Sequence, residues 1–143
     1  MTHIHRSALL MHTPRQLFAL VDDVERYTEF VPGVIAARVH ERTVGSLLAT
    51  LKLKRAGISI EFTTRNTRTP DSAMRMELVQ GPFKVFRAQW RFAALGDAGA
   101  KVEFDADVEV SGVLRGPVAL IVESASNKLM EAFRKRAAAL YAP

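Results

Sequence analysis

The C-terminal segment, residues 116–142, limits the possible folds more than any other part of the sequence. Pro117 suits the first turn of a helix, and neither glycine nor proline follows until Pro143. A helix of this length extends about 35–40 Å at about 1.5 Å per residue. At helical spacing one stripe of it is apolar: Val118, Ile121, Val122, Ala125, Leu129, Ala132, Phe133, Ala139 and Leu140. Such a helix needs a broad apolar surface, which the rest of the chain must supply.

Two features of this stripe are unusual. A seven-residue row within it is nearly all alanine and makes one edge shallow: Val118, Ala125, Ala132 and Ala139. Arg136 lies within the stripe, where an unpaired charge would be costly to bury. We expect it to pair with one acid of a cluster in residues 22–29: Asp22, Asp23, Glu25 and Glu29. The alternative is that these acids form an acid–base site, but carboxylates without a base or metal do little chemistry.

Between residues 34 and 110 apolar residues recur at every second position. This period is typical of strands with one solvated face, and successive short strands of this kind form an antiparallel sheet. The predicted strands are 4–11, 34–42, 47–54, 58–65, 74–78, 86–92 and 102–110. Across the last hairpin we expect Arg87, Gln89 and Arg91 to face Glu103, Asp105 and Asp107. Opposite charges facing each other contribute about 0.2–1 kcal/mol per pair, so they set register more than stability.

Two short helices are predicted between the first two strands. Thr13 can cap the first, Pro14 suits its first position, and Gln16 completes a capping box. The second extends over residues 24–31 and ends before Pro32. The chain therefore predicts an α+β fold, in which a curved, seven-stranded antiparallel sheet surrounds the long C-terminal helix.

Length and composition fit one domain over residues 1–143. A chain of this size buries enough surface to be stable without disulfides or metals. The absence of cysteine excludes a disulfide scaffold and a thiolate metal site. No apolar run has the length of a membrane span, and the N-terminus lacks a signal-sequence pattern. We expect a soluble, cytoplasmic protein, with peripheral contact to the inner membrane left open.

Six groups of short runs, in order along nearly the whole chain, carry a family resemblance. They are Arg6-Ser7-Ala8-Leu9, Asp23-Val24-Glu25-Arg26-Tyr27 with Phe30 and Pro32, Phe62-Thr63-Thr64-Arg65-Asn66, Gly81-Pro82-Phe83-Lys84, Trp90-Arg91-Phe92, and Ala132-Phe133 with Arg136-Ala137. Together they resemble the coenzyme-Q-binding START-like family, which includes ribosome-association toxins and proteins labelled polyketide cyclases. One departure is Gly33-Val34, which stands where the family has Trp-Cys and would reshape the mouth of a cavity.

The resemblance implies the helix-grip fold, with a hydrophobic cavity between helix and sheet for a lipid such as an isoprenoid quinone. The shallow alanine edge and the large side chains of the sheet favour a cavity. The alternative is a solid core, where such residues are most often found. The expected lining residues are Phe30, Pro32, Leu51, Ile60, Phe62, Met74, Met76, Phe83, Phe86, Trp90, Phe104, Val108, Ala125, Leu129, Ala132 and Phe133.

Residues 34–69 carry seven basic side chains and two acidic ones, an excess equal to the whole net charge of +5. The basic residues are Arg38, Arg42, Lys52, Lys54, Arg55, Arg65 and Arg68. This excess suggests an acidic partner, either ribosomal nucleic acid or an acidic membrane surface. The alternative is an ordinary solvated face. The segment lacks the exposed aromatics of single-strand binders, and DNA is not expected as a partner.

The sequence contains no P-loop, GxGxxG, GxSxG or HExxH motif. His3 and His5 share a strand face and could bind a metal, but a site needs three or four ligands. We therefore interpret them, with His12 and His40, as solvated surface residues, and expect neither a metal nor a cofactor.

The sequence supports three functional hypotheses. The first is a non-enzymatic carrier or chaperone of a hydrophobic ligand, an isoprenoid quinone that serves respiration. The second, implied by the toxin branch of the family, is binding to the large ribosomal subunit, which blocks subunit joining. The first two are compatible. The third is a polyketide cyclase or dehydratase, which the absence of an inward acid–base pair disfavours.

Overall fold

The computed structural model describes residues 1–110, 112–113 and 115–141. Its order of elements is the predicted one: one strand, two short helices, six strands and a long helix. They are β1 (Thr2–Leu10), α1 (Pro14–Asp22), η1 (Val24–Glu29), β2 (Val34–Arg42), β3 (Ser46–Arg55), β4 (Ile58–Thr69), β5 (Ala73–Gln80), β6 (Val85–Leu95), β7 (Gly99–Glu109) and α2 (Arg115–Leu140). The predicted fold class is confirmed.

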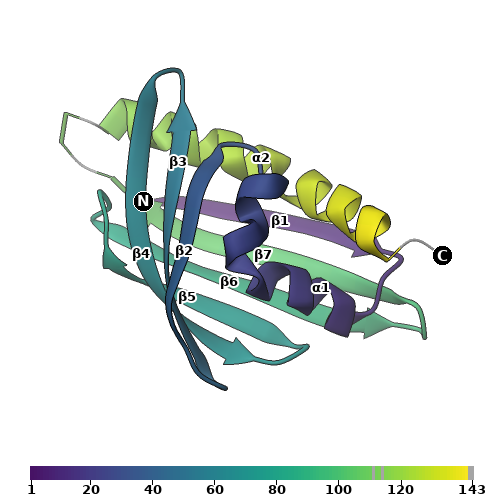
Figure 1. The fold of residues 1–143 in the computed structure, drawn as a ribbon. Coiled ribbons are helices and arrows are strands. Elements are labelled where there is room, and N and C mark those ends of the chain that lie inside the picture. Colours follow the sequence, from purple (N-terminus) through teal and green to yellow (C-terminus); the bar gives the residue numbers. More distant parts are fainter. Residues whose placement is uncertain (111, 114, 142–143) are drawn as a thin grey trace.

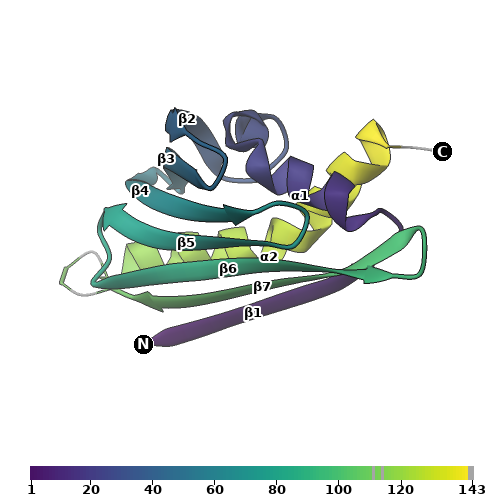
Figure 2. The ribbon, with the colours of Figure 1, turned by 90° about the horizontal axis from the view of Figure 1, so that it is seen from below.

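The seven strands form one antiparallel sheet in the order β1-β7-β6-β5-β4-β3-β2. Figures 1 and 2 show that the sheet bends, so that β2, β3 and β4 run across the direction of β1. Helix α2 runs in nearly the same direction as β1. The register of the β6–β7 hairpin is the predicted one, because Arg87 pairs with Asp107 and Arg91 with Glu103. Arg87 Nε lies 2.9 Å from Asp107 Oδ2. The charges on this outer face therefore do oppose one another across the two strands.

Helix α1 begins as its sequence predicts. The Thr13 hydroxyl accepts a hydrogen bond from the backbone N–H of Gln16, and the Gln16 side chain accepts one from the Thr13 N–H. Its apolar face is buried, and the Phe18 ring contacts the Phe92 ring of β6 edge-on. The second short helix, η1, has 3-10 geometry. Together α1 and η1 cover the part of the core that α2 leaves open.

Helix α2 buries Val118, Ile121, Ala132 and Phe133, as the apolar stripe predicts. The prediction was wrong for the last turn, where Ala139 and Leu140 are exposed and Ala137 is the fully buried residue. In a straight α-helix, two residues seven positions apart do not lie exactly above one another but are rotated by about 20° about the helix axis. A row of residues spaced by seven therefore rotates by roughly 60° over three heptads. The alanine row therefore leaves the sheet before the helix ends.

Candidate functional site

A cavity of about 110 Å³ lies between the curved sheet and α2. It is lined by Tyr27, Val31, Val34, Leu51, Leu53, Phe62, Met76, Phe83, Phe86, Trp90, Phe104, Val122, Ala125, Ser126, Leu129 and Phe133. Its walls come from η1 and the loop after it, from the strands of the sheet, and from one face of α2. The sequence fits this position because the sheet presents large apolar side chains while Ala125 and Ser126 keep the helix wall shallow.

Ten of the sixteen residues predicted to line the cavity do so: Leu51, Phe62, Met76, Phe83, Phe86, Trp90, Phe104, Ala125, Leu129 and Phe133. Two others, Ile60 and Met74, are instead packed into the core. Phe30, Pro32 and Ala132 line a separate groove along the outside of α2. Phe30 and Pro32 lie there because the chain between η1 and β2 passes over the helix, and Ala132, although buried, borders this groove and not the cavity.

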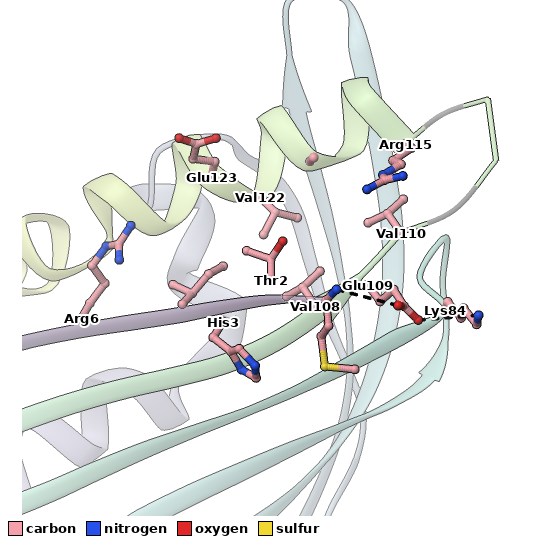
Figure 3. A pocket seen from close by; sticks show the side chains of 13 residues that line it. Thr2, His3, Arg6, Lys84, Val108, Glu109, Val110, Arg115, Val122 and Glu123 are labelled. Carbon is pink, nitrogen blue, oxygen red and sulfur yellow. Dashed lines mark ion pairs between the residues drawn. The ribbon is translucent and has the colours of Figure 1, made fainter.

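Val108 also lies outside the cavity, in a pocket of about 530 Å³ between the start of β1 and the start of α2. Figure 3 shows that this pocket is bordered by charged side chains, among them Arg6, Arg115 and Glu123. Lys84 Nζ lies 3.8 Å from a Glu109 carboxylate oxygen at its edge. Val108 is displaced from the cavity because β7 continues past the cavity at this point. The pocket is far more polar than the cavity.

Aromatic rings make up much of the cavity wall. The rings of Phe62, Phe83 and Phe86 lie within 5.4 Å of one another, centroid to centroid. On the other side Trp90 contacts Phe104 and Phe133 at 4.9 and 5.2 Å. Such a wall offers a flat or chain-like apolar ligand contact on several sides.

Only two polar side chains, Tyr27 and Ser126, are among the described residues that line the cavity. The Tyr27 hydroxyl donates a hydrogen bond to the Val21 carbonyl oxygen. Burial raises the pKa of Tyr27 well above its usual value, and Asp22 and Asp23 act in the same direction. The Ser126 hydroxyl donates to the Val122 carbonyl oxygen at 2.8 Å. Both hydroxyl protons are therefore held by the protein itself, and the lining interacts mainly through apolar contact.

The departure from the family pattern lies beside this cavity. Gly33 has a φ of +88°, a conformation that favours glycine, and its carbonyl oxygen accepts a hydrogen bond from the Lys54 N–H at 2.9 Å. Val34, the next residue, lines the cavity. Five further lining residues were not predicted: Tyr27, Val31, Leu53, Val122 and Ser126. The predicted second helix contained Tyr27 and Val31, but nothing in its pattern showed that it faces the cavity.

Arg136 pairs with Glu29, an acid of the predicted cluster, at 3.0 Å. Its guanidinium also lies over the Phe30 ring, 5.0 Å from the centroid. The hydrogen bond from Arg136 is the main reason that the pKa of Glu29 lies below its ordinary value of 4.5. Two other acids of the cluster have different partners: Asp22 binds Arg42 and Arg68, and Asp23 binds Arg26. The cluster thus holds helices and strands together.

We expect the Arg136–Glu29 pair to make stability depend on pH. Because the folded-state pKa of Glu29 is lowered, its contribution is present above pH 4.5 and is lost as the pH falls through the folded pKa. Arg136→Gln should therefore melt below the parent protein at pH 7, and the gap should narrow on acidification below pH 4.5. Melting curves recorded across this pH range measure the difference in melting temperature between the parent and the variant. The control is Arg15→Gln, which alters an exposed arginine. A gap that stays constant with pH would show that the pair contributes nothing.

The basic residues of the segment 34–69 fall into two groups. Arg42 and Arg68 bind Asp22, Arg65 binds Glu41 at 3.6 Å, and the Arg55 side chain donates to the Leu120 carbonyl oxygen. The second group makes neither an ion pair nor a side-chain hydrogen bond with a described residue: Arg38, Lys52 and Lys54. Arg55 likewise has no acidic partner among the described residues. The potential phosphate-binding surface is therefore smaller than the sequence suggests, because long-range pairing neutralises several of the cations.

The histidines on β1 are exposed but have partners on β7. His3 contacts Asp107, and His5 Nδ1 lies 2.6 Å from Asp105. His5, Asp105 and Glu103 are close enough to share an ion. However, Arg91 already lies within 3.3 Å of both carboxylates, and its charge opposes a cation there. His40 is a surface residue that hydrogen-bonds Thr50, and His12 is half-buried beside Tyr141.

None of the described helices is both long and apolar enough to cross a bilayer.

Comparisons with known proteins agree with this architecture. The model of the family described as polyketide cyclase / dehydrase and lipid transport matches residues 10–134. A Pseudomonas aeruginosa protein named ribosome association toxin RatA is 38% identical over 98% of both chains. The solution structure of an 18 kDa Caulobacter crescentus protein is 32% identical, with a TM-score of 0.79 and full coverage of both chains. A Streptomyces aromatase/cyclase, Zhui, shares the fold at a TM-score of 0.85, with 16% identity over 95% of this chain and 93% of its own.

Proposed function

We propose that this chain, which belongs to the polyketide cyclase/dehydrase and lipid transport family, binds an apolar small molecule between its sheet and α2. The observation that carries the proposal is the composition of the cavity wall, which is aromatic and aliphatic apart from two hydroxyls whose protons the protein already holds. Burial of apolar area is worth about 25 cal/mol per Å². A ligand without polar groups in the cavity would therefore be favoured there.

An isoprenoid quinone is the ligand that the family resemblance favours. The cavity, at about 110 Å³, is comparable with an apolar cavity of about 150 Å³ that binds benzene. It therefore suits one ring-sized group, and an isoprenoid tail would have to extend beyond it. Such a protein would carry or protect the quinone for respiration.

A binding role is better supported than a catalytic one. Aromatic cyclisation needs a group that takes up and returns a proton in contact with the substrate. The raised pKa of Tyr27 keeps its phenol neutral, and its proton is directed at Val21. The fold alone, which the chain shares with an aromatase/cyclase, does not carry the chemistry.

The proposal is tested by mass spectrometry of an organic extract of the protein purified from cells. We expect the extract to contain an apolar molecule in an amount that corresponds to a substantial fraction of the protein chains. The same extraction from Ala125→Phe, a variant that narrows the cavity, should yield much less of it. If parent and variant carry the same small amounts of cell lipid, the cavity is not a binding site.

Association with the ribosome is a second candidate function. It is favoured by the full-length similarity to proteins named ribosome association toxin RatA and by basic residues that have no acidic partner among the described residues, among them Arg38, Lys52 and Lys54. These side chains lie on β2 and β3 at one edge of the sheet, where they could follow ribosomal RNA phosphates. In this role the protein would bind the large subunit and block subunit joining. The cavity is lined by none of these three residues, so binding of an apolar ligand and of a ribosomal partner are compatible.

We expect Lys52→Glu with Lys54→Glu to weaken co-sedimentation with large ribosomal subunits. For every phosphate that the protein no longer binds, the slope of log affinity against log salt should flatten by about 0.7–0.9. The matched control is Arg75→Glu with Lys101→Glu, on strands β5 and β7. If co-sedimentation changes neither with salt nor in the Lys52→Glu, Lys54→Glu variant, this surface does not bind the ribosome.

A further inference from the structure

A second space of about 130 Å³ adjoins the cavity where the end of β3 meets α2; we term it the side pocket. Leu53 and Ala125 line both the side pocket and the cavity, so the two spaces adjoin at these two side chains. Pro32 and Gly33 form part of its border. Because Gly33 has no side chain, the loop between η1 and β2 leaves this part of the side pocket open.

Three cations border the side pocket: Lys54 and Arg55 at the end of β3, and Lys128 on α2. Lys128 lies one helical turn beyond Ser124 and on the same face, because residues four apart on a helix are neighbours. Arg55 is held at the pocket by a 3.4 Å hydrogen bond to the Leu120 carbonyl oxygen. Lys54 is fixed through its backbone bond to Gly33.

No acidic residue is among the described residues that line the side pocket. The acids nearest in sequence on α2 are directed elsewhere. Glu131 pairs with Arg134, and Glu123 lines the polar pocket near the N-terminus, where Figure 3 shows its carboxylate. None of the three cations forms an ion pair with a described residue. An anion in the side pocket would therefore meet cationic residues and no acidic one among the described lining residues.

We propose that the side pocket binds the anionic group of an amphiphilic ligand, a carboxylate or a phosphate, whose apolar part occupies the cavity. This inference rests on the proposed function and adds to it the chemical class of the ligand. Lysine and arginine donate charge-assisted hydrogen bonds to such groups, which are stronger than bonds between neutral partners. Because Leu53 and Ala125 line both spaces, an anion in the side pocket lies directly beside the apolar cavity. Ser124, also at the pocket, supplies a neutral donor.

Titration calorimetry with matched ligands tests the proposal. The probes are decanoate below its micelle concentration, decanol, and inorganic phosphate, each added to the parent protein and to Arg55→Gln with Lys128→Gln. Both altered residues are exposed, so the fold should persist, and a melting curve checks it. The control is Lys135→Gln with Arg15→Gln, two exposed cations away from the side pocket.

The parent protein should bind decanoate at least about tenfold more tightly than decanol, a ratio that corresponds to 1.4 kcal/mol. The double variant should lose this preference and keep its affinity for decanol, while the control keeps both. Equal binding of decanoate and decanol by the parent would overturn the anion site and leave the cavity function standing. If neither binds, the cavity function itself fails. If inorganic phosphate binds as tightly as decanoate, the side pocket is a site for free anions, and the proposal of an amphiphilic ligand is overturned.

Discussion

Phe133→Ala should lower the free energy of unfolding by about 3–5 kcal/mol, the usual cost of emptying a buried phenylalanine site. Phe133 is 4% exposed, and its ring makes edge-on contacts with Tyr27, Phe30 and Trp90, at centroid distances of 5.7, 5.1 and 5.2 Å. Through Phe133, α2 therefore contacts both η1 and the sheet. A chain of this size should lose roughly 10–15 °C in melting temperature.

Leu140→Ala is the matched control for this prediction. Leu140 belongs to the same helix and to the same predicted apolar stripe, but it is 52% exposed. Its truncation should change stability by less than about 0.5 kcal/mol. If the two variants melt at similar temperatures, the packing of α2 on the sheet is not organised around Phe133.

Ala125→Phe should weaken binding of an apolar ligand by at least about tenfold, equivalent to 1.4 kcal/mol, while the protein stays folded. The added ring projects from the one helix residue that lines both the cavity and the side pocket. In a space of about 110 Å³ it competes directly with the ligand. Because the ring enters existing free volume, its cost in stability should stay at or below the roughly 1–3 kcal/mol of an overpacked core.

Ala138→Phe places the same ring on the exposed face of the same helix. It should bind ligand as the parent does, which separates filling of the cavity from a general effect of a larger residue on α2. If Ala125→Phe unfolds and the parent has no measurable affinity for apolar ligands, the domain has a solid core.

Local patterns in the sequence predicted most of the fold because they act over a few residues. The Thr13–Gln16 capping box starts α1, and the charges of residues 87–91 and 103–107 match the observed register of β6 and β7. Alternation showed which face of each strand is apolar. It did not show how deep each residue lies, since Met74 and Phe62 alternate in the same way, yet only Phe62 lines the cavity.

Features that depend on distant parts of the chain were not predictable from such patterns. Asp22 pairs with Arg42 and Arg68, which lie 20 and 46 residues away. These pairs reduce the basic surface that the composition suggested. The spacing of the alanine row predicts that it faces the cavity along its whole length, but only Ala125 lines the cavity. The small difference between a seven-residue repeat and two helical turns, added over the helix, turns the row away from the cavity, so that Ala132 is buried beside a separate groove and Ala139 is exposed.

The most direct test of the binding function uses the fluorescence of Trp90, the single tryptophan of the chain. Trp90 is 3% exposed and lines the cavity, so a quinone ring in the cavity lies in contact with it. Titration with a short-chain quinone should quench this fluorescence saturably, with one site per chain, and Ala125→Phe should abolish the saturable part. Quenching that rises linearly with quinone, and equally in parent and variant, would mean random collision and would contradict a binding site in the cavity.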